Sequence, residues 1–104
     1  MRQASVYYKE ELAGTIIELD NGTYTFKYND IWLADTQKPA ISLTLAKQKA
    51  IYTSEYLMPF FYNLLPEGTN KKIICNNLKI DEKDYFSLLI ATANKDTIGA
   101  IMIQ

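Results

Sequence analysis

The sequence contains no histidine and a single cysteine among its 104 residues. Histidine is the commonest general base in enzymes, and both Ser-His-Asp triads and Cys-His nucleophile pairs require it. Zinc sites likewise draw on sets of cysteine and histidine. The composition therefore excludes these catalytic centres and the usual zinc ligand sets.

Glycine-rich phosphate-binding loops are also missing. The four glycines are scattered, and neither G-x-x-x-x-G-K-[ST] nor G-x-G-x-x-G occurs. Acidic residues do cluster at Asp81, Glu82 and Asp84, but at the start of a helix such residues are explained by capping and by the helix dipole. We therefore expect no catalytic residue, no metal ion and no cofactor, and we expect that the protein is not an enzyme.

Neither sign of charge predominates, and no long apolar run occurs. A formal net charge of -1 and a pI near 5.3 provide no field that would hold a polyanion, so direct nucleic-acid binding is not expected. The N-terminus lacks a hydrophobic signal region, and no apolar run approaches the roughly 18 residues of a membrane span. The lone Cys75 cannot form an intrachain disulfide, which fits a reducing compartment. We expect a cytoplasmic protein without membrane contact.

The residues that are present suffice for one folded domain. Hydrophobic residues make up 48% of the chain and charged residues 22%, as in ordinary globular proteins. A chain of this length buries about two thirds of its unfolded surface when it folds. Since no linker, repeat or low-complexity tract interrupts it, we expect a single domain over residues 1–104.

Strand patterns dominate the first half of the chain. Asp20-Asn21-Gly22 predicts a tight hairpin turn, because such residues tolerate positive φ angles. A polar turn is predicted at residues 9–11. Runs of β-branched and aromatic residues, or alternating apolar and polar residues, predict strands over residues 5–8, 15–19, 23–28 and 41–45.

Helical periodicity begins near residue 53. The first helix starts either at Thr53 or Ser54, with Pro59 in its interior, or near Met58, with Pro59 in its first turn. The sequence leaves both starts open. Pro66 is predicted to end this helix.

Two further helices and a last strand follow. The second helix is predicted through Lys71, Ile74 and Leu78, and the third after an N-cap at Asp81. An apolar strand is predicted over residues 99–103. Strands followed by helices and a final strand indicate an α+β fold, with a mostly antiparallel sheet of about five strands and about three helices packed on it.

Aromatic residues offer two candidate binding surfaces. Tyr24, Phe26 and Tyr28 share one face of a predicted strand, where they either pack in the core or stack nucleic-acid bases. The absence of interleaved basic residues favours the core. Trp32 lies in a segment that we interpret as too short for a regular element, and it either seals one end of the sheet or anchors a partner.

The run at residues 60–68 is the most specific segment of the chain. It places apolar residues directly before a Pro-Glu-Gly turn, and it contains no reactive group suited to an active site. We expect at least half of Phe60, Phe61, Leu64 and Leu65 to be core residues. Asn63 and Glu67 are better candidates for polar contacts with a partner, because the apolar stripe does not require them.

Several segments, taken in order, resemble the N-terminal domain of HipA-type toxin kinases over nearly the whole chain. They are Asn21-Gly22-Thr23-Tyr24-Thr25-Phe26-Lys27-Tyr28, Trp32-Leu33-Ala34, Ile41-Ser42-Leu43-Thr44-Leu45, Phe60-Phe61-Tyr62-Asn63-Leu64-Leu65-Pro66-Glu67-Gly68, Phe86-Ser87-Leu88-Leu89 and Gly99-Ala100. In that family the domain packs on a serine/threonine kinase core. The chain is similar to HipS, the free-standing small subunit of tripartite HipBST toxin-antitoxin systems.

The resemblance implies an antitoxin that binds and neutralises a HipA-like or HipT-like kinase encoded by a separate gene. It also raises a HipB-like DNA-binding protein as a third member of the complex. The partner-binding residues implied by the turn, together with the tryptophan considered above, are Trp32, Asn63, Leu65, Pro66, Glu67, Gly68 and Thr69. Alternatives are a subunit that completes the kinase fold and a small nucleic-acid-binding module that uses the aromatic sheet face.

The chain departs from the family pattern at two places. Full-length members tend to carry Gly-Arg-Asp before the last strand, where this chain has Asn94-Lys95-Asp96. Many relatives have a tryptophan directly after the Pro-Glu-Gly turn, where this chain has Thr69. The second departure bears on how the domain would obstruct a kinase more than on whether it binds one.

Overall fold

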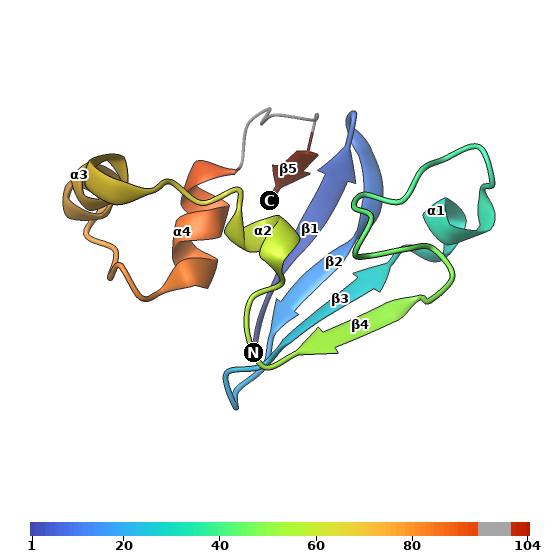
Figure 1. The fold of residues 1–104 in the computed structure, drawn as a ribbon, viewed down its shortest axis with the longest axis horizontal. Helices are drawn as coiled ribbons and strands as arrows, with labels where there is room; N and C mark the ends of the chain where they lie inside the picture. Colours follow the sequence, from blue (N-terminus) through green and yellow to red (C-terminus); the bar gives the residue numbers. More distant parts are fainter. Residues whose placement is uncertain (94–100) are drawn as a thin grey trace.

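The computed structural model describes residues 1–93 and 101–104, and it confirms the α+β class. The described part contains one five-stranded antiparallel sheet, in the order β4-β3-β2-β1-β5, and four helices (Figure 1). The elements are β1 (Arg2–Tyr8), β2 (Glu11–Glu18), β3 (Tyr24–Tyr28), α1 (Asp30–Ala34), β4 (Ile51–Ser54), α2 (Pro59–Tyr62), α3 (Gly68–Leu78), α4 (Tyr85–Thr92) and β5 (Ile101–Ile103).

Two tight turns connect the first three strands. The predicted hairpin turn at residues 20–22 is confirmed: Gly22 has φ +85°, and its N–H donates to the carbonyl of Leu19 at 2.9 Å. The turn between β1 and β2 is shorter than predicted. Lys9 and Glu10 form it with positive φ angles, and Glu11 already belongs to β2.

The aromatic stripe of β3 lies in the core. Tyr24 is 8% exposed, and Phe26 and Tyr28 are fully buried. The phenol of Tyr28 donates to the carbonyl of Leu45 and accepts the N–H of Ile41 at 3.1 Å. This burial removes the aromatic face on which the nucleic-acid alternative depended.

The prediction of a strand over residues 41–45 is wrong. This segment consists of bends and turns, in which Ile41 and Leu45 are buried but Leu43 is fully exposed. Bonds from the backbone at Ile41 and Leu45 to the phenol of Tyr28 hold this loop against the core, where both side chains are buried without forming a strand. On the side of β3 away from β2, the neighbouring strand is β4, which begins ten residues after Ile41 and places Tyr52 opposite Phe26.

The first predicted helix begins at one of the two starts that the sequence left open, near Met58, whereas the N-cap of the third corrects the prediction. The first predicted helix is α2, which begins at Pro59 after Met58 at the N-cap, so the alternative start at residues 53–54 is wrong because that segment belongs to β4. The N-cap of α4 is Asp84 rather than Asp81. The Asp81 carboxylate instead accepts the N–H of Lys83 at 2.8 Å within the preceding turn.

Of the remaining predicted elements, one is corrected by the structure and two are confirmed. The segment around Trp32, interpreted as irregular, forms the short helix α1. The second predicted helix is confirmed as α3, and β5 confirms the end of the predicted last strand. Gly99, Ala100 and Asn94-Lys95-Asp96 lie outside the described residues.

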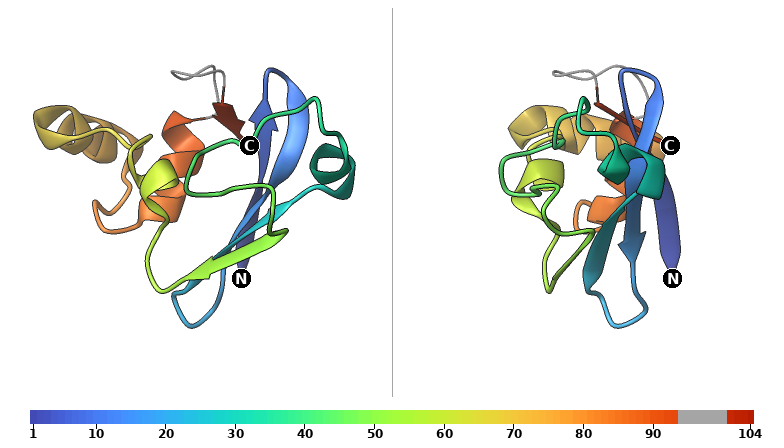
Figure 2. Two further views of the ribbon diagram at one scale, coloured as in Figure 1. Left: turned by 45° about the vertical axis from the view of Figure 1, so that its right-hand side comes forward. Right: turned by 90° about the vertical axis from the view of Figure 1, so that its right-hand side faces the viewer.

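The helices α2, α3 and α4 lie on one side of the sheet (Figure 2). Of these, α2 and α4 bring Phe61, Phe86 and Leu89 into the core, all fully buried. By contrast α3 lies farthest from the sheet in Figures 1 and 2, and among its residues only Cys75 is buried. The turn between α2 and α3 therefore lies at the margin of the domain.

Candidate partner-binding site

The site predicted around the Pro-Glu-Gly turn is anchored by apolar side chains. Phe61 is fully buried and Leu65 is 7% exposed, while Phe60 and Leu64 are partly buried against the same core. The expectation that at least half of these four residues belong to the core is confirmed. Among the predicted site residues, Leu65 thus anchors the turn in the core. Its side chain has little exposed surface with which to contact a partner.

Backbone hydrogen bonds fix the path of the turn. The N–H of Asn63 donates to the carbonyl of Pro59 at 2.9 Å, and the N–H of Leu65 donates to the carbonyl of Tyr62 at 3.1 Å. Gly68 then takes φ +57°, a left-handed conformation that favours glycine because it has no Cβ. The chain therefore enters α3 along one defined path.

Polar side chains project from this fixed backbone. Asn63, Glu67 and Thr69 are exposed, and Glu67 is the N-cap residue of α3 without a side-chain hydrogen bond to the helix. Lys71, one helical turn later, places its ammonium over the ring of Tyr85 at 5.3 Å. Within the described part of the chain, no ion pair engages the Glu67 carboxylate, which leaves it available to a partner.

A shallow hollow of about 180 Å³ follows the turn. Its lining combines apolar and charged side chains, and consists of Tyr62, Leu65, Pro66, Glu67, Gly68 and Lys71. The structure thus brings together all the predicted site residues from Asn63 to Thr69 on one short segment, and four of them line one hollow. We call this segment, residues 63–69, the turn surface.

Trp32 lies apart from the turn surface. It is 3% exposed, its indole N–H donates to the carbonyl of Pro39 at 2.9 Å, and its ring packs on Tyr8 with centroids 5.6 Å apart. In Figures 1 and 2 its helix, α1, lies at the opposite end of the molecule from α3. These contacts favour the role of sealing one end of the sheet over that of anchoring a partner.

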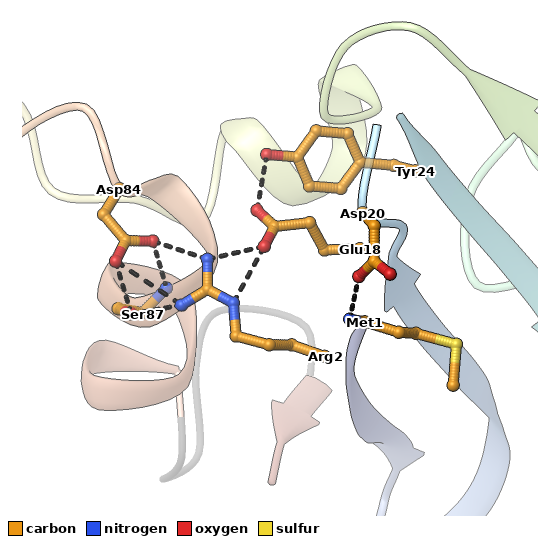
Figure 3. Close-up of polar contacts among 7 residues, drawn as sticks. All are labelled: Met1, Arg2, Glu18, Asp20, Tyr24, Asp84 and Ser87. Atoms are coloured by element: carbon orange, nitrogen blue, oxygen red, sulfur yellow. Dashed lines mark hydrogen bonds and ion pairs between the residues drawn. The ribbon is translucent and has the colours of Figure 1, made fainter. Parts of the chain in front are cut away.

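Sequence reasoning missed the charged network that joins the N-terminus to α4 (Figure 3). The guanidinium of Arg2 donates to Asp84 at 2.8 Å, to Ser87 at 2.7 Å and, through Nε, to Glu18 at 2.8 Å. The phenol of Tyr24 donates to the second oxygen of Glu18 at 3.3 Å. The spacing Asp84-x-x-Ser87 is that of a helix N-cap and was the available signal, but nothing local points to Arg2, 82 residues earlier.

The network affects the ionisation of its members. The hydrogen bond from Arg2 holds the pKa of the Asp84 carboxyl below its ordinary value, because it stabilises the ionised form. Burial raises the pKa of the Tyr24 phenol, with the charge of Glu18 adding to the effect. At neutral pH Asp84 is therefore ionised and Tyr24 is a neutral hydrogen-bond donor.

The same network positions the turn surface indirectly. Asp84 caps α4, whose first residue, Tyr85, packs edge to face on Tyr62 of α2 with centroids 5.6 Å apart. Tyr62 in turn lines the hollow of the turn surface. Strand β1, helix α4 and the turn are thus connected through a short series of direct contacts.

The described part of the chain offers neither a metal site nor a membrane-spanning helix. Across residues 1–93 and 101–104, no group of three or more cysteine, aspartate and glutamate side chains could hold a metal ion. None of the helices in the same ranges has the length and apolarity needed to cross a membrane.

The chain is thus a small α+β domain with an exposed, hydrogen-bonded turn, and comparison with known proteins identifies its family. The sequence model of the HipA N-terminal domain matches residues 4–104, so the chain belongs to the HipA N-terminal domain family. A solved N-terminal domain of HipA toxin superposes with a TM-score of 0.71 and 28% identity, covering 100% of this chain and 93% of that one.

Curated relatives differ in length. The chain is 31% identical over 104 residues to an uncharacterized Haemophilus influenzae protein, covering 100% of this chain and 92% of that protein. It is also similar to two Sinorhizobium fredii proteins named for a proposed kinase activity. Y4dM is 27% identical over 90% of this chain and Y4mE 25% identical over 99%, and the match spans 24% of each of those proteins.

Proposed function

We propose that the protein is a non-catalytic regulatory subunit that binds a HipA-like or HipT-like serine/threonine kinase encoded by a separate gene and neutralises it, as a HipS-like antitoxin. The observation that carries this proposal is the turn surface. Asn63, Glu67 and Thr69 are exposed on a backbone that the buried side chains of Phe61 and Leu65 hold in place. Membership of the HipA N-terminal domain family, and similarity to proteins named for a proposed kinase activity, support a kinase as the partner.

The mechanism that we propose is steric. The turn surface docks near the mouth of the kinase active cleft and excludes substrate or holds the kinase inactive. Because Gly68 and the hydrogen bonds of the turn define its path already, little conformational entropy is lost on docking. Glu67 supplies a carboxylate that no ion pair engages within the described part of this chain, so a basic group of the kinase is its natural counterpart.

A second candidate function is completion of the kinase fold rather than its inhibition. The specific observation in its favour is that in Y4dM and Y4mE the matching segment makes up only 24% of a longer protein. A domain that packs on the rest of such a protein can be required for its folding. In either case we propose a cytoplasmic complex, with a HipB-like DNA-binding protein as a further member.

Co-expression separates these candidates. The chain is produced with the HipA-like kinase expected from the adjacent gene, and host growth and co-purification are scored together. Antitoxin action predicts that the kinase alone arrests growth and that this chain restores growth and co-purifies. Completion of the fold predicts an insoluble or inactive kinase alone. The absence of both a complex and any effect on growth would refute a kinase partner.

A further inference from the structure

A second hollow, of about 380 Å³, lies beside the turn surface. Four parts of the chain form it. They are the β2–β3 turn with the first residue of β3, the segment between β4 and α2, α2 itself, and the end of the α3–α4 connection with the start of α4. Its lining is Gly22, Tyr24, Glu55, Tyr56, Leu57, Tyr62, Lys83 and Tyr85. We call it the tyrosine groove, and its volume lies in the range of sites that bind small groups.

Tyrosine rings make up half of this lining. Tyr56 is 77% exposed and Tyr62 is 45% exposed, an unusual position for large aromatic side chains in a domain that buries most of its others. Aromatic rings attract cations through the negative charge on their faces. This chain already uses the interaction beside the groove, where the Lys71 ammonium lies over the ring of Tyr85 at 5.3 Å.

The charges around the groove favour a cation. Glu55 lines the groove and is exposed, and within residues 1–93 and 101–104 it forms no ion pair. We consider the charged residues that line the groove, contact its tyrosines, adjoin Lys83 and Tyr85 in the sequence, or are bonded to one of these residues. Among them, acidic residues outnumber basic ones. The acidic residues are Glu18, Glu55, Asp81, Glu82 and Asp84, and the basic residues are Arg2, Lys71 and Lys83.

Hydrogen bonds outside the groove hold two of its tyrosines in place. Tyr24 is bonded to Glu18, and Glu18 is bonded to Arg2 (Figure 3). Arg2 also binds Asp84, which caps the helix that begins with Tyr85. Two of the four tyrosines are therefore fixed by one charged network, whereas Tyr56 at the rim is free to adjust to a guest.

We propose that the tyrosine groove binds an arginine side chain of a partner protein. The guanidinium is planar and stacks on aromatic rings while it donates hydrogen bonds to a carboxylate, and the groove offers both tyrosines and Glu55. The open position of Tyr56 suits a side chain delivered on a polypeptide. The inference is independent of the proposed function, since it names the group that is recognised and not the identity of the partner.

Two residues of opposite charge line the groove, and they should affect the binding of a cation in opposite ways. Lys83 carries a positive charge at the rim and opposes a cationic guest, so its removal strengthens binding. Glu55 attracts the guest, so its removal weakens binding. Opposite effects of two neutral replacements on the same groove are expected for a cation site and not for a merely apolar one.

The experiment is an amide NMR titration of the full chain with the peptide acetyl-Gly-Arg-Gly-amide, compared with the peptide that has citrulline in place of arginine. Citrulline has nearly the same shape without the charge. The arginine peptide is expected to shift the amides of Gly22, Glu55, Tyr56, Lys83 and Tyr85 in a saturable manner, at a Kd of about 1 mM or weaker, as suits a single side chain. The citrulline peptide is expected to shift them far less.

Three variants complete the test. Tyr56→Leu and Glu55→Gln are each expected to weaken binding about two- to fivefold, the change that corresponds to one exposed cation–π contact. Lys83→Gln is expected to strengthen binding by a similar factor. Glu10→Gln, at an exposed turn outside the groove, is the matched control and is expected to change nothing. Equal binding of the two peptides, shifts that map elsewhere, or no saturable shift would overturn the proposal.

Discussion

The guanidinium of Arg2 donates to the carboxylate of Asp84 at 2.8 Å, joining the first residue of β1 to the N-cap of α4 across 82 residues of sequence. Arg2 also lies over the ring of Phe86 at 5.1 Å. Arg2 therefore ties α4 to β1, in addition to the apolar side chains that α4 buries in the core. Through Tyr85 and Tyr62, the same contact helps to set the position of the turn surface.

Replacement of Arg2 by methionine is expected to lower the free energy of unfolding by about 1–2 kcal/mol. Hydrogen bonds to charged groups contribute more than neutral ones, but partial exposure of both partners reduces the value. Denaturant unfolding measures the change. Lys27→Met is the matched control, because Lys27 is exposed and forms no ion pair within the described part of the chain. An equal effect of both substitutions would contradict this role for Arg2.

The Asp84 carboxyl should add a defined component to the pH dependence of stability. Its pKa is lower in the folded state than in the unfolded state, so its contribution is present above the unfolded value, about 3.9. That contribution is lost as pH falls through the lower, folded value. Asp84→Asn keeps a residue suited to the N-cap but removes the charge. Unfolding curves of the two proteins should therefore differ most at neutral pH and converge in acid, and a constant difference at every pH would refute the assignment.

Gly14 of β2 is expected to tolerate no larger residue. A Cβ at this position would lie 2.5 Å from the carbonyl oxygen of Lys27 and 2.7 Å from the ring of Phe26, and neither can move without disturbing the β2–β3 pair. Gly14→Ala is therefore expected to lower the free energy of unfolding by about 1–3 kcal/mol or more. Thermal unfolding measures it, with Gly22→Ala as the comparison. At Gly22 a Cβ meets nothing within 4 Å, so only the strain of its positive φ, about 1–2 kcal/mol, applies.

Alternation of apolar and polar residues correctly predicts strands that have one face in the core. In β3 the alternation of Tyr24, Phe26 and Tyr28 matches the buried face, and the turn before it has the expected glycine. The same signal misled at residues 41–45, where two inward side chains belong to a loop that is bonded to the Tyr28 phenol. At Leu43, which is fully exposed, the alternation does not even match burial, and nowhere does it report whether a strand partner exists.

Boundaries decided by one side chain were harder to predict. Asp81 and Asp84 are both suitable N-caps, and only the contacts of Asp84 with Ser87 and Arg2 distinguish them. The turn surface could be predicted, because a local sequence motif and its resemblance to a known family both point to it. The charged network of Arg2, Glu18 and Asp84 could not, because it depends on contacts between residues distant in sequence. The tyrosine groove likewise draws on four separate segments, which no window of sequence brings together.

Binding of the kinase by the turn surface, as proposed above, is open to direct measurement. Its direct test is calorimetric titration of the purified kinase with wild-type chain and with the triple variant Pro66→Ala, Glu67→Gln, Thr69→Ala. A matched control is the double variant Thr36→Ala, Gln48→Ala, whose side chains are exposed in the 35–50 segment. We expect the triple variant to bind at least about tenfold more weakly, a loss of about 1.4 kcal/mol, with an unchanged unfolding midpoint, and we expect the control to bind as wild type does. Unchanged affinity of the triple variant would contradict the claim, and equal losses of affinity and stability would show that the motif serves the fold alone.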